Sequence, residues 1–444
     1  MIGKSSNQNQ KNIFSPLLKD FINLHHELVL LADRIDWKYF EDEFAEYYSN
    51  TGKPSMPIRL MVGSLMLKRI YNLGDETLCE TWVRDPYMQY FCGSAHFEHK
   101  FPCDPSDFVH FRKRISEQGV AKIFAYSVEL HGKSAEEKMT LSDTTVAENN
   151  TTFPTDAKLA KKIIDNCNTI AKKENVDQRQ TYIRVSKQLV RDTYNPSHPK
   201  RKKKAKKAAR KLKTIAGRLV RELERNLSNK AYEKKLTFYK QVLAQKRTDK
   251  DKVYSLHKPF TACIAKGKAH KKYEFGNKIG IVTTAKTLII TAIQSFTGNP
   301  HDSKTIEPLL DQIKSHFNFT PKEVIYDRGG KGQNKIGDTI VSTPDYKPLK
   351  RDTPYEKRKK RTKFRRRAAI EPVIGHLKSD FRMAQNYLSG DKSPQINALL
   401  AATGWNLKKM MMKLKKEFLW LYYLPNKLNS ISYSQTHSLQ ILSS

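Results

Sequence analysis

The spacing of hydrophobic residues divides the chain into a helical first part and a later part that mixes strands with helices. Within residues 15–132, apolar side chains recur at helical spacing in three segments that start near Leu60, Asp75 and Ser106. The third segment contains Gly119, where we predict a break in the helix. Short helices joined by polar turns fit a helix-turn-helix DNA-binding unit and a plain helical bundle equally well.

Strand patterns follow this helical part. Residues 139–146 are rich in β-branched side chains, and residues 273–282 and 287–293 flank a short turn as the strands of an antiparallel hairpin do. Residues 323–326 predict a short buried strand that ends in an acidic residue and a glycine turn. Strands interspersed with helices predict a mixed α/β sheet covered by helices.

Helices separate and follow these strands. Asp302 or Ser303 would cap a helix over residues 306–317, and a second apolar helix covers residues 396–414. Residues 157–250 are helix-forming and strongly basic, with few glycines or prolines. We therefore expect long helices there rather than a flexible linker, although a solvated charged arm has the same composition.

These patterns predict a multidomain chain. The helical N-terminal domain takes residues 1–135, and the α/β domain takes residues 136–415, interrupted by a helical basic insert at about 157–250. Residues 416–444 form a C-terminal tail. A chain of 444 residues is long enough for each domain to bury its own core.

The charge balance points to a polyanionic partner. With 81 Lys and Arg against 45 Asp and Glu, the net charge is +36, which attracts phosphate backbones. A membrane surface is the competing polyanion, but no apolar run approaches the roughly 18 residues that a transmembrane helix needs, and the first residues resemble no secretion signal. We expect a cytoplasmic protein with no membrane partner.

The five cysteines are an odd, scattered set, which favours reduced thiols over a disulfide framework. One group could bind zinc, because Cys92, His96, His99 and Cys103 offer four ligands within twelve residues. Their spacing matches no common finger pattern. Two small core cysteines and two surface histidines are the simpler interpretation.

Positive charge is concentrated in two segments. Residues 200–213 carry ten Lys or Arg in fourteen positions, and residues 357–367 carry nine in eleven. The residues that we expect to contact DNA phosphate in these segments are Lys200, Arg201, Lys202, Arg365 and Arg366. Glu371 follows the second segment, and taken alone it reads as a surface carboxylate that partly neutralises a basic helix.

Two further acids change that interpretation of Glu371. Asp143 lies in the first predicted strand, and Asp327 lies at the carboxyl end of a later one, where ligand sites of open α/β sheets gather. Three converging carboxylates repel each other unless cations bridge them, and hard oxygen ligands favour Mg2+ or Mn2+. Two such ions about 4 Å apart would clamp an in-line phosphoryl displacement.

Helical geometry places Arg367, Glu371 and Lys378 on one face, beside an apolar stripe that would dock on the sheet. Pro372 complicates this arrangement. A proline disfavours helical geometry at the preceding residue, so the helix either begins at Pro372 or is kinked there.

An ordered set of motifs resembles the DDE transposases of bacterial insertion sequences. Phe364-x2-Arg367-x3-Glu371-x6-Lys378 resembles their Y-x2-R-x3-E-x6-K signature, with Phe in place of Tyr. The segments that look like the strands bearing the first two acids are Asp143-Thr144-Thr145 and Tyr326-Asp327-Arg328-Gly329. Residues 270–276, residues 298–302 and the helical residues 20–130 are also similar to the family.

This resemblance implies an RNase H-like domain whose DDE triad uses two Mg2+ ions. Asp143, Asp327 and Glu371 would be the catalytic metal ligands, and Arg367 and Lys378 would contact the transposon-end phosphates or help order the site. Because Phe364 lacks the phenolic hydroxyl, any hydrogen bond made by that Tyr in relatives is in doubt here.

The sequence therefore predicts a DNA transposase. The expected partners are double-stranded DNA, as terminal inverted repeats and target, and a second copy of the chain in a homodimer or larger synaptic complex. We expect the protein to be associated with the nucleoid. Two alternatives remain open, namely a structure-selective nuclease of the same fold without strand transfer, and a catalytically inactive DNA-binding protein.

Overall fold

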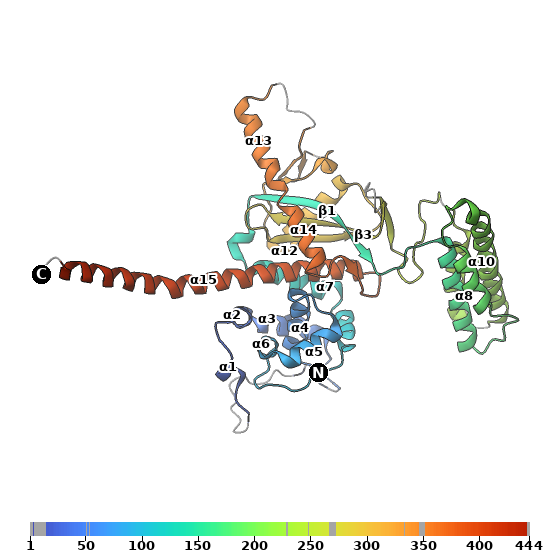
Figure 1. The fold of residues 1–444 in the computed structure, drawn as a ribbon, viewed down its shortest axis with the longest axis horizontal. Coiled ribbons are helices and arrows are strands. Elements are labelled where there is room, and N and C mark those ends of the chain that lie inside the picture. Colours follow the sequence, from blue (N-terminus) through green and yellow to red (C-terminus); the bar gives the residue numbers. More distant parts are fainter. Residues whose placement is uncertain are drawn as a thin grey trace.

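The computed structural model describes residues 3, 15–49, 51–52, 54–227, 230–246, 248–265, 272–332, 334–345 and 351–441, with side chains in the last helix up to Trp420. One mixed sheet lies at its centre, with α12 (Ile306–Phe317) on one face and α14 (Ile370–Ser379) and α15 (Ser393–Ile441) on the other (Figure 1). The N-terminal helices lie beyond α15. The sequence predicts this α/β class, and the prediction is confirmed.

In the part of the chain that the structure describes, the sheet has eight strands: β1 (Met139–Asn149), β2 (Ala262–Ala265), β3 (Tyr273–Thr284), β4 (Ile290–Phe296), β5 (Glu323–Ile325), β6 (Lys335–Ile336), β7 (Thr339–Ser342) and β8 (Gln385–Asn386). Their order is β2-β3-β1-β5-β7-β6, while β4 also pairs with β3 and β8 with β1. Strand β1 is antiparallel to β3 and parallel to β5. The path β4-β3-β1-β5-β7 is RNase H-like, and the predicted hairpin is β3 with β4.

Alternation along the strands gives the sheet two apolar faces. Leu141 and Ile325 lie on one face and pack with Ile370 of α14. Val282 and Val324 lie on the other face and pack against α12. Because side chains of a strand point alternately to the two faces, both layers of helices are needed to cover the sheet.

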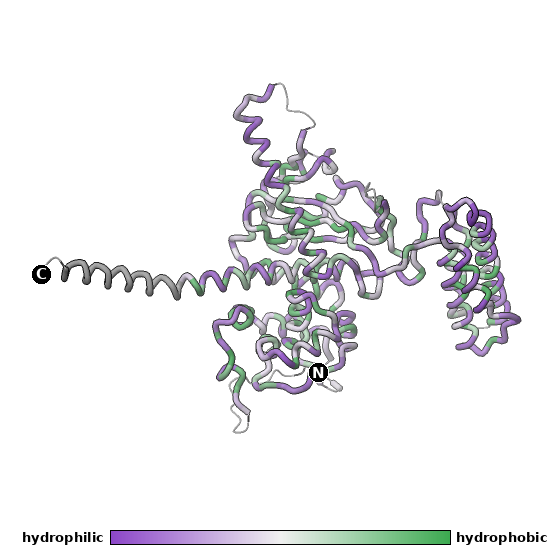
Figure 2. Tube along the Cα trace, viewed as in Figure 1, coloured by the Kyte–Doolittle hydropathy of each residue, from purple (hydrophilic) through white to green (hydrophobic). Residues whose placement is uncertain are grey.

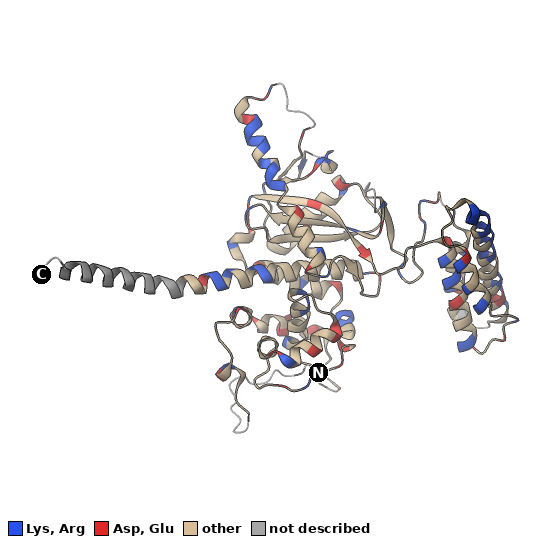
Figure 3. Cartoon of the chain, in the orientation of Figure 1, with Lys and Arg blue, Asp and Glu red and all other residues tan. Residues whose placement is uncertain are grey.

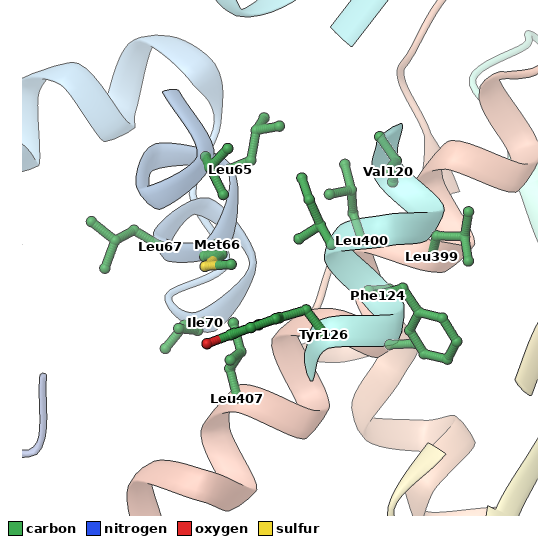
Figure 4. Packing of buried hydrophobic residues seen from close by; sticks show 14 of the residues in the cluster. Leu65, Met66, Leu67, Ile70, Val120, Phe124, Tyr126, Leu399, Leu400 and Leu407 are labelled. Carbon is green, nitrogen blue, oxygen red and sulfur yellow. The ribbon is translucent and has the colours of Figure 1, made fainter. Parts of the chain in front are cut away.

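The N-terminal part consists of α1 (Leu18–Phe21), α2 (Glu27–Arg34), α3 (Trp37–Phe44), η1 (Ala45–Tyr47), α4 (Ile58–Ile70), α5 (Asp75–Arg84), α6 (Pro86–Phe91), α7 (Asp107–Glu129) and η2 (Gly132–Ala135). These helices share one hydrophobic core with α14, α15 and the sheet. Figure 4 shows Met66 of α4 and Phe124 of α7 close to Leu400 of α15. The N-terminal helices are thus packed directly on the α/β part.

Buried polar contacts fix the same junction. Asn406 of α15 accepts the Ile290 N–H of β4 at 3.0 Å and donates to Ser127 of α7 at 3.3 Å. Arg69 of α4 donates to the Phe381 carbonyl at 3.1 Å and to Asn397 of α15 at 3.0 Å. A buried polar group costs free energy without a partner, so these bonds favour one relative placement of the two parts.

The break predicted within α7 lies elsewhere. Gly119 is helical, whereas Ser116 leaves the helix with φ 57° and ψ −167°. A Cβ at residue 119 would lie 2.6 Å from the Ile115 Cβ and 3.5 Å from the Phe44 ring. The glycine is therefore required for close packing, and the prediction of a break at Gly119 was wrong.

The basic insert between β1 and β2 forms α8 (Asp156–Lys173), α9 (Ile183–Asp192), α10 (Pro199–Asn226), η3 (Lys230–Tyr232) and α11 (Glu233–Ala244). Its apolar side chains form a separate core. Figure 2 shows hydrophobic positions alternating with hydrophilic ones along these helices. Long helices, rather than a charged arm, occupy this segment. The insert lies to one side of the sheet (Figure 1).

Helix α13 (Pro354–Arg367) projects from the sheet and precedes α14. Helix α15 continues to Ile441, well past residue 414, where the apolar pattern predicts its end. Among the residues that the structure describes, no helix combines the length and apolar character required to cross a membrane. His270 and Lys271, which belong to one of the family-like segments, lie outside the described residues.

Candidate functional site

Asp143 lies within β1, and Asp327 follows the end of β5, the strand that pairs with β1 in parallel. Strand β1 pairs with β5 in parallel, with Leu141 opposite Ile325, and each aspartate lies two residues further along its chain. Because strand side chains alternate, each aspartate points to the same face as the apolar residue two positions before it. Adjacent strands lie about 4.8 Å apart, so this register brings the two carboxyl groups together at the edge where β5 ends.

Asp143 is a largely buried carboxyl group, with a side chain 18% exposed. Its Oδ1 accepts the Thr144 N–H at 2.7 Å, and its Oδ2 accepts from the Arg367 guanidinium at 3.1 Å. Burial raises the pKa of Asp143, and the charges of Asp327 and Asp302 raise it further, against the lowering effect of Thr144 and Arg367. Burial therefore outweighs the two hydrogen-bonding groups that stabilise the ionised carboxylate of Asp143.

Glu371 is linked to Asp143 through Arg367. The second terminal nitrogen of the guanidinium donates to the Glu371 Oε1 at 3.1 Å. The Glu371 side chain is 61% exposed, and it enters the site from α14. One planar cation thus lies between two of the three predicted acids.

Pro372 lies inside the first turn of α14, which begins at Ile370. In a continuous helix, the proline ring would clash with the carbonyl four residues earlier, at Ala368. The helix is interrupted there: α13 ends at Arg367, and the Glu371 N–H donates to the Ala368 carbonyl at 3.2 Å. The break precedes Pro372, and it leaves the contact between Arg367 and Glu371 intact.

Asp327 is fixed by the turn that follows β5. Its Oδ1 accepts the Gly329 N–H at 2.8 Å within η5 (Arg328–Gly330). A Cβ at Gly329 would lie 2.5 Å from the Asp302 Oδ2 and 3.0 Å from the Asp327 Oδ1. Only glycine fits between these two carboxyl groups.

Asp302 is a fourth acid at the site, which the sequence analysis missed. It lies in η4 (Asp302–Thr305), and its Oδ1 accepts from Lys278 at 2.7 Å and from Thr144 at 3.0 Å. Helix α12 starts only at Ile306, so the prediction that Asp302 or Ser303 caps it was wrong. Asp302 belongs to the family-like segment at residues 298–302, which could have marked it as a site residue, but an aspartate at this position also suits a helix N-cap.

The donor set suits a divalent cation only in part. Asp143 and Asp327 present the hard carboxylate oxygens that Mg2+ and Mn2+ prefer. Glu371 is kept from them by the Arg367 guanidinium. Within the described residues, no three His, Cys, Asp or Glu side chains are grouped as metal ligands. The third carboxylate can join the first two only after Arg367 moves.

The predicted phosphate-contacting residues of α13 differ in their surroundings. This helix has no buried residue, and Figure 3 shows it as an almost continuous run of Lys and Arg. Arg365 is exposed. Arg366 instead donates to the Ala285 carbonyl at 2.5 Å and to the Lys286 carbonyl at 3.1 Å, which anchors α13 to the turn between β3 and β4. Phe364 packs against the small cluster around Ile370.

The remaining predicted residues lie at two other places. Lys378 is half-buried in the last turn of α14, one turn beyond Val373, which packs on the core. Lys200, Arg201 and Lys202 are exposed in the first turn of α10 in the insert. The insert residues are thus part of a second basic surface, separate from α13 in Figure 3.

The candidate zinc ligands do not converge. Cys92 is buried, and its sulfur lies 3.8 Å from the Ser64 hydroxyl. Burial raises the pKa of the Cys92 and Cys103 thiols to about 12 each, which disfavours the thiolate that zinc requires. His96 contacts the Pro16 carbonyl instead, at 3.2 Å.

Comparisons with known proteins match both halves of the chain. Residues 16–114 match the family described as Transposase domain (DUF772), and residues 247–407 match the Transposase DDE domain. A Rhizobium meliloti protein, named uncharacterized protein ORF8 in nfe locus, is 37% identical over 186 residues, which are 41% of this chain and 90% of that protein. No solved structure gives a significant match. From its two matched domains and its RNase H-like sheet, the chain belongs to the DDE transposase family.

Proposed function

We propose that this protein cuts the ends of a DNA element and joins them to target DNA, using Asp143, Asp327 and Glu371 as its catalytic carboxylates. The observation that carries the proposal is the parallel pairing of β1 with β5, which supports convergence of Asp143 and Asp327 two residues beyond the Leu141–Ile325 pair, together with the link from Glu371 to Asp143 through Arg367. Members of this family act on DNA with divalent metal.

The three carboxylates would hold two Mg2+ ions, or Mn2+ in their place. Bound divalent cations supply the Lewis acidity that activates water and stabilises charge on the phosphorus oxygens in an in-line displacement. In this step Arg367 would exchange its carboxylate contacts for a contact with DNA. Its guanidinium leaves Asp143 for a DNA phosphate, which frees Asp143 and Glu371 and neutralises backbone charge.

The basic surfaces would hold the DNA backbone. Helix α13 with Arg365, and α10 with Lys200, Arg201 and Lys202, offer exposed cations whose phosphate contacts release counterions. Arg366 supports this indirectly by anchoring α13. The N-terminal helices are our candidates for reading the terminal inverted repeats. Because two ends must be cut and joined together, we expect a homodimer or a larger synaptic complex.

The test is a cleavage assay on a plasmid that carries the DNA flanking the gene, with Mg2+. We expect the wild-type protein to cut at the element ends. Asp327→Asn and Glu371→Gln should each lower cleavage by at least about 100-fold, because each removes a metal ligand whose contribution to the transition state is several kcal/mol. DNA affinity should stay within about twofold. Asp311→Asn, at an exposed acid of α12, is the matched control and should cleave normally.

A second assay separates the rival functions. Pre-cut ends and a supercoiled target are incubated with the wild-type protein, and joined product is measured. Joining supports a transposase, whereas cleavage without joining would favour a structure-selective nuclease. An Asp327→Asn variant that cleaves as well as the wild type would contradict the assignment of the site.

A further inference from the structure

The insert contains a basic groove that the proposed DNA contacts do not explain. It has a volume of about 850 Å3 and lies between the start of α8, the end of α9 with the turn that follows it, and one face of α10. This volume is in the range of ligand sites in proteins. All residues that line the groove belong to the insert, which has its own hydrophobic core.

An exposed aromatic ring stands in this groove. Tyr194, in the turn after α9, is 73% exposed, and the Arg201 guanidinium lies over its ring, 5.8 Å from the centroid. A cation on one face of the ring limits its movement and leaves the other face open for stacking. A large exposed aromatic side chain has no role in the packing of the insert, which is made by the buried faces of α8 and α10.

The charge of the groove selects an anionic ligand. Its lining has five basic residues, Lys158, Arg191, Arg201, Lys202 and Lys206, against one acid, Asp156. The acid already pairs with Lys252 at 2.9 Å. Among the described residues, Lys202 and Lys206 form no ion pair, whereas the neighbouring Lys204 is paired with Asp192.

Apolar wall residues complete the chemistry. Ala157 and Ala205 are buried, and Ala209 and Val190 are half-buried beside them. A flat heterocycle can lie against such methyl groups while the lysines at the rim contact phosphate. A stacking ring, phosphate-binding cations and apolar walls form the combination that holds unpaired nucleotides. Paired bases are already stacked on both faces, so duplex DNA cannot use the Tyr194 ring.

We propose that this groove binds an unpaired stretch of DNA, with a base stacked on Tyr194 and its flanking phosphates held by Lys202 and Lys206. The proposal rests on the proposed function, because a strand end freed by cleavage supplies unpaired nucleotides. It deepens that function by assigning the insert a preference for single strands, beyond a general affinity for backbone phosphate.

The experiment compares two DNA probes with the full-length protein. Fluorescence anisotropy measures binding of an oligothymidine of about 16 nucleotides and of a duplex of the same length. Tyr194→Ala should weaken single-strand binding about tenfold and change duplex binding less than about twofold. Tyr194→Phe keeps the ring and should bind as the wild type does. The Lys202→Ala, Lys206→Ala double variant should weaken both probes, because it removes phosphate contacts.

A charge-matched control and a spectroscopic readout sharpen the result. Lys172→Ala with Lys173→Ala removes two exposed lysines at the opposite end of α8 and should leave single-strand binding within about twofold. In a strand containing 2-aminopurine, the wild type and Tyr194→Phe should quench the fluorescence by stacking, and Tyr194→Ala should not. Since Tyr194 is exposed, circular dichroism should show all variants folded.

The outcomes separate the two proposals. Single-strand affinity unchanged by Tyr194→Ala, or lost equally for both probes, would overturn the groove and leave the transposase function standing. Wild-type protein that binds neither probe would overturn the proposed function itself. Single-strand affinity that falls only in Tyr194→Ala and in the Lys202, Lys206 variant supports the groove.

Discussion

Replacing Arg367 by Gln tests whether its guanidinium occupies the place of a metal ion between the carboxylates of Asp143 and Glu371. The substitution removes hydrogen bonds of 3.1 Å to Asp143 and 3.1 Å to Glu371. The Glu371 side chain is 61% exposed, so water screens that half of the bridge and its contribution is small. The bond to the largely buried Asp143 is charge-assisted, and we expect its loss to cost about 2 kcal/mol near pH 7.5.

The cost should depend on pH with a defined sign. Burial already raises the pKa of Asp143, Asp327 and Asp302 add to this, and Arg367 opposes it. Without Arg367 the pKa of Asp143 rises further. A raised carboxyl pKa means that the folded state disfavours the ionised form, so stability is lost as pH rises through the folded pKa and is fully retained below the unfolded value near 4. The variant should therefore differ most from the wild type at neutral pH and approach it on acidification.

The assay is thermal unfolding of both proteins between about pH 4 and 8, with and without Mg2+. If the proposed function is right, Arg367 and Mg2+ compete for Asp143 in the wild type, so added Mg2+ should raise the unfolding temperature of Arg367→Gln more than that of the wild type. Arg365→Gln is the control, because Arg365 is an exposed arginine of the same helix, and it should show neither effect. Equal Mg2+ stabilisation of the two proteins, or a difference that does not change with pH, would refute the competition.

Two further substitutions probe the site and the core. Gly329→Ala places a methyl group 2.5 Å from the Asp302 Oδ2, and it should lower cleavage about tenfold or more without unfolding the chain; Gly217→Ala, in the insert, should not. Burial lowers the pKa of Lys258 to about 8, so the protonated form costs stability below that pH. Relative to Lys258→Met, the wild type should gain up to about 2 kcal/mol between pH 7 and 9.5, measured by thermal unfolding, and a pH-independent difference would contradict this.

Elements with a strong local pattern were predictable. The β3–β4 hairpin and α12 follow from apolar periodicity within single segments, and each is where the sequence places it, with β4 starting at Ile290. Strands β6 and β7 were missed. They are only two and four residues long, and they are joined through Gly337 with φ 54°. Such strands exist only because β7 pairs with β5, which no local pattern reveals.

The sequence singles out the three acids of the proposed site, whereas their contacts could not be predicted from it. The position of each acid at a strand end or helix start is a local property, but the register of β1 and β5 depends on pairing between distant segments. Asp302 was missed for the same reason. Its partners Lys278 and Thr144 lie on two other strands, and along the chain the residue is indistinguishable from a helix cap.

Pro372 lies where one short segment passes from the basic helix that we propose to bind DNA to the helix that carries the proposed catalytic Glu371. Helix α13 ends at Arg367 and α14 begins at Ile370, and Ala368 and Ala369 between them keep helical backbone angles. Helix α13 has no buried residue, whereas α14 packs Val373 and Leu377 into the core. Arg367 and Glu371 lie on opposite sides of this junction and remain bonded across it. This contact ties the last residue of the basic helix to Glu371, so a phosphate that binds Arg367 would also change the contacts of Glu371.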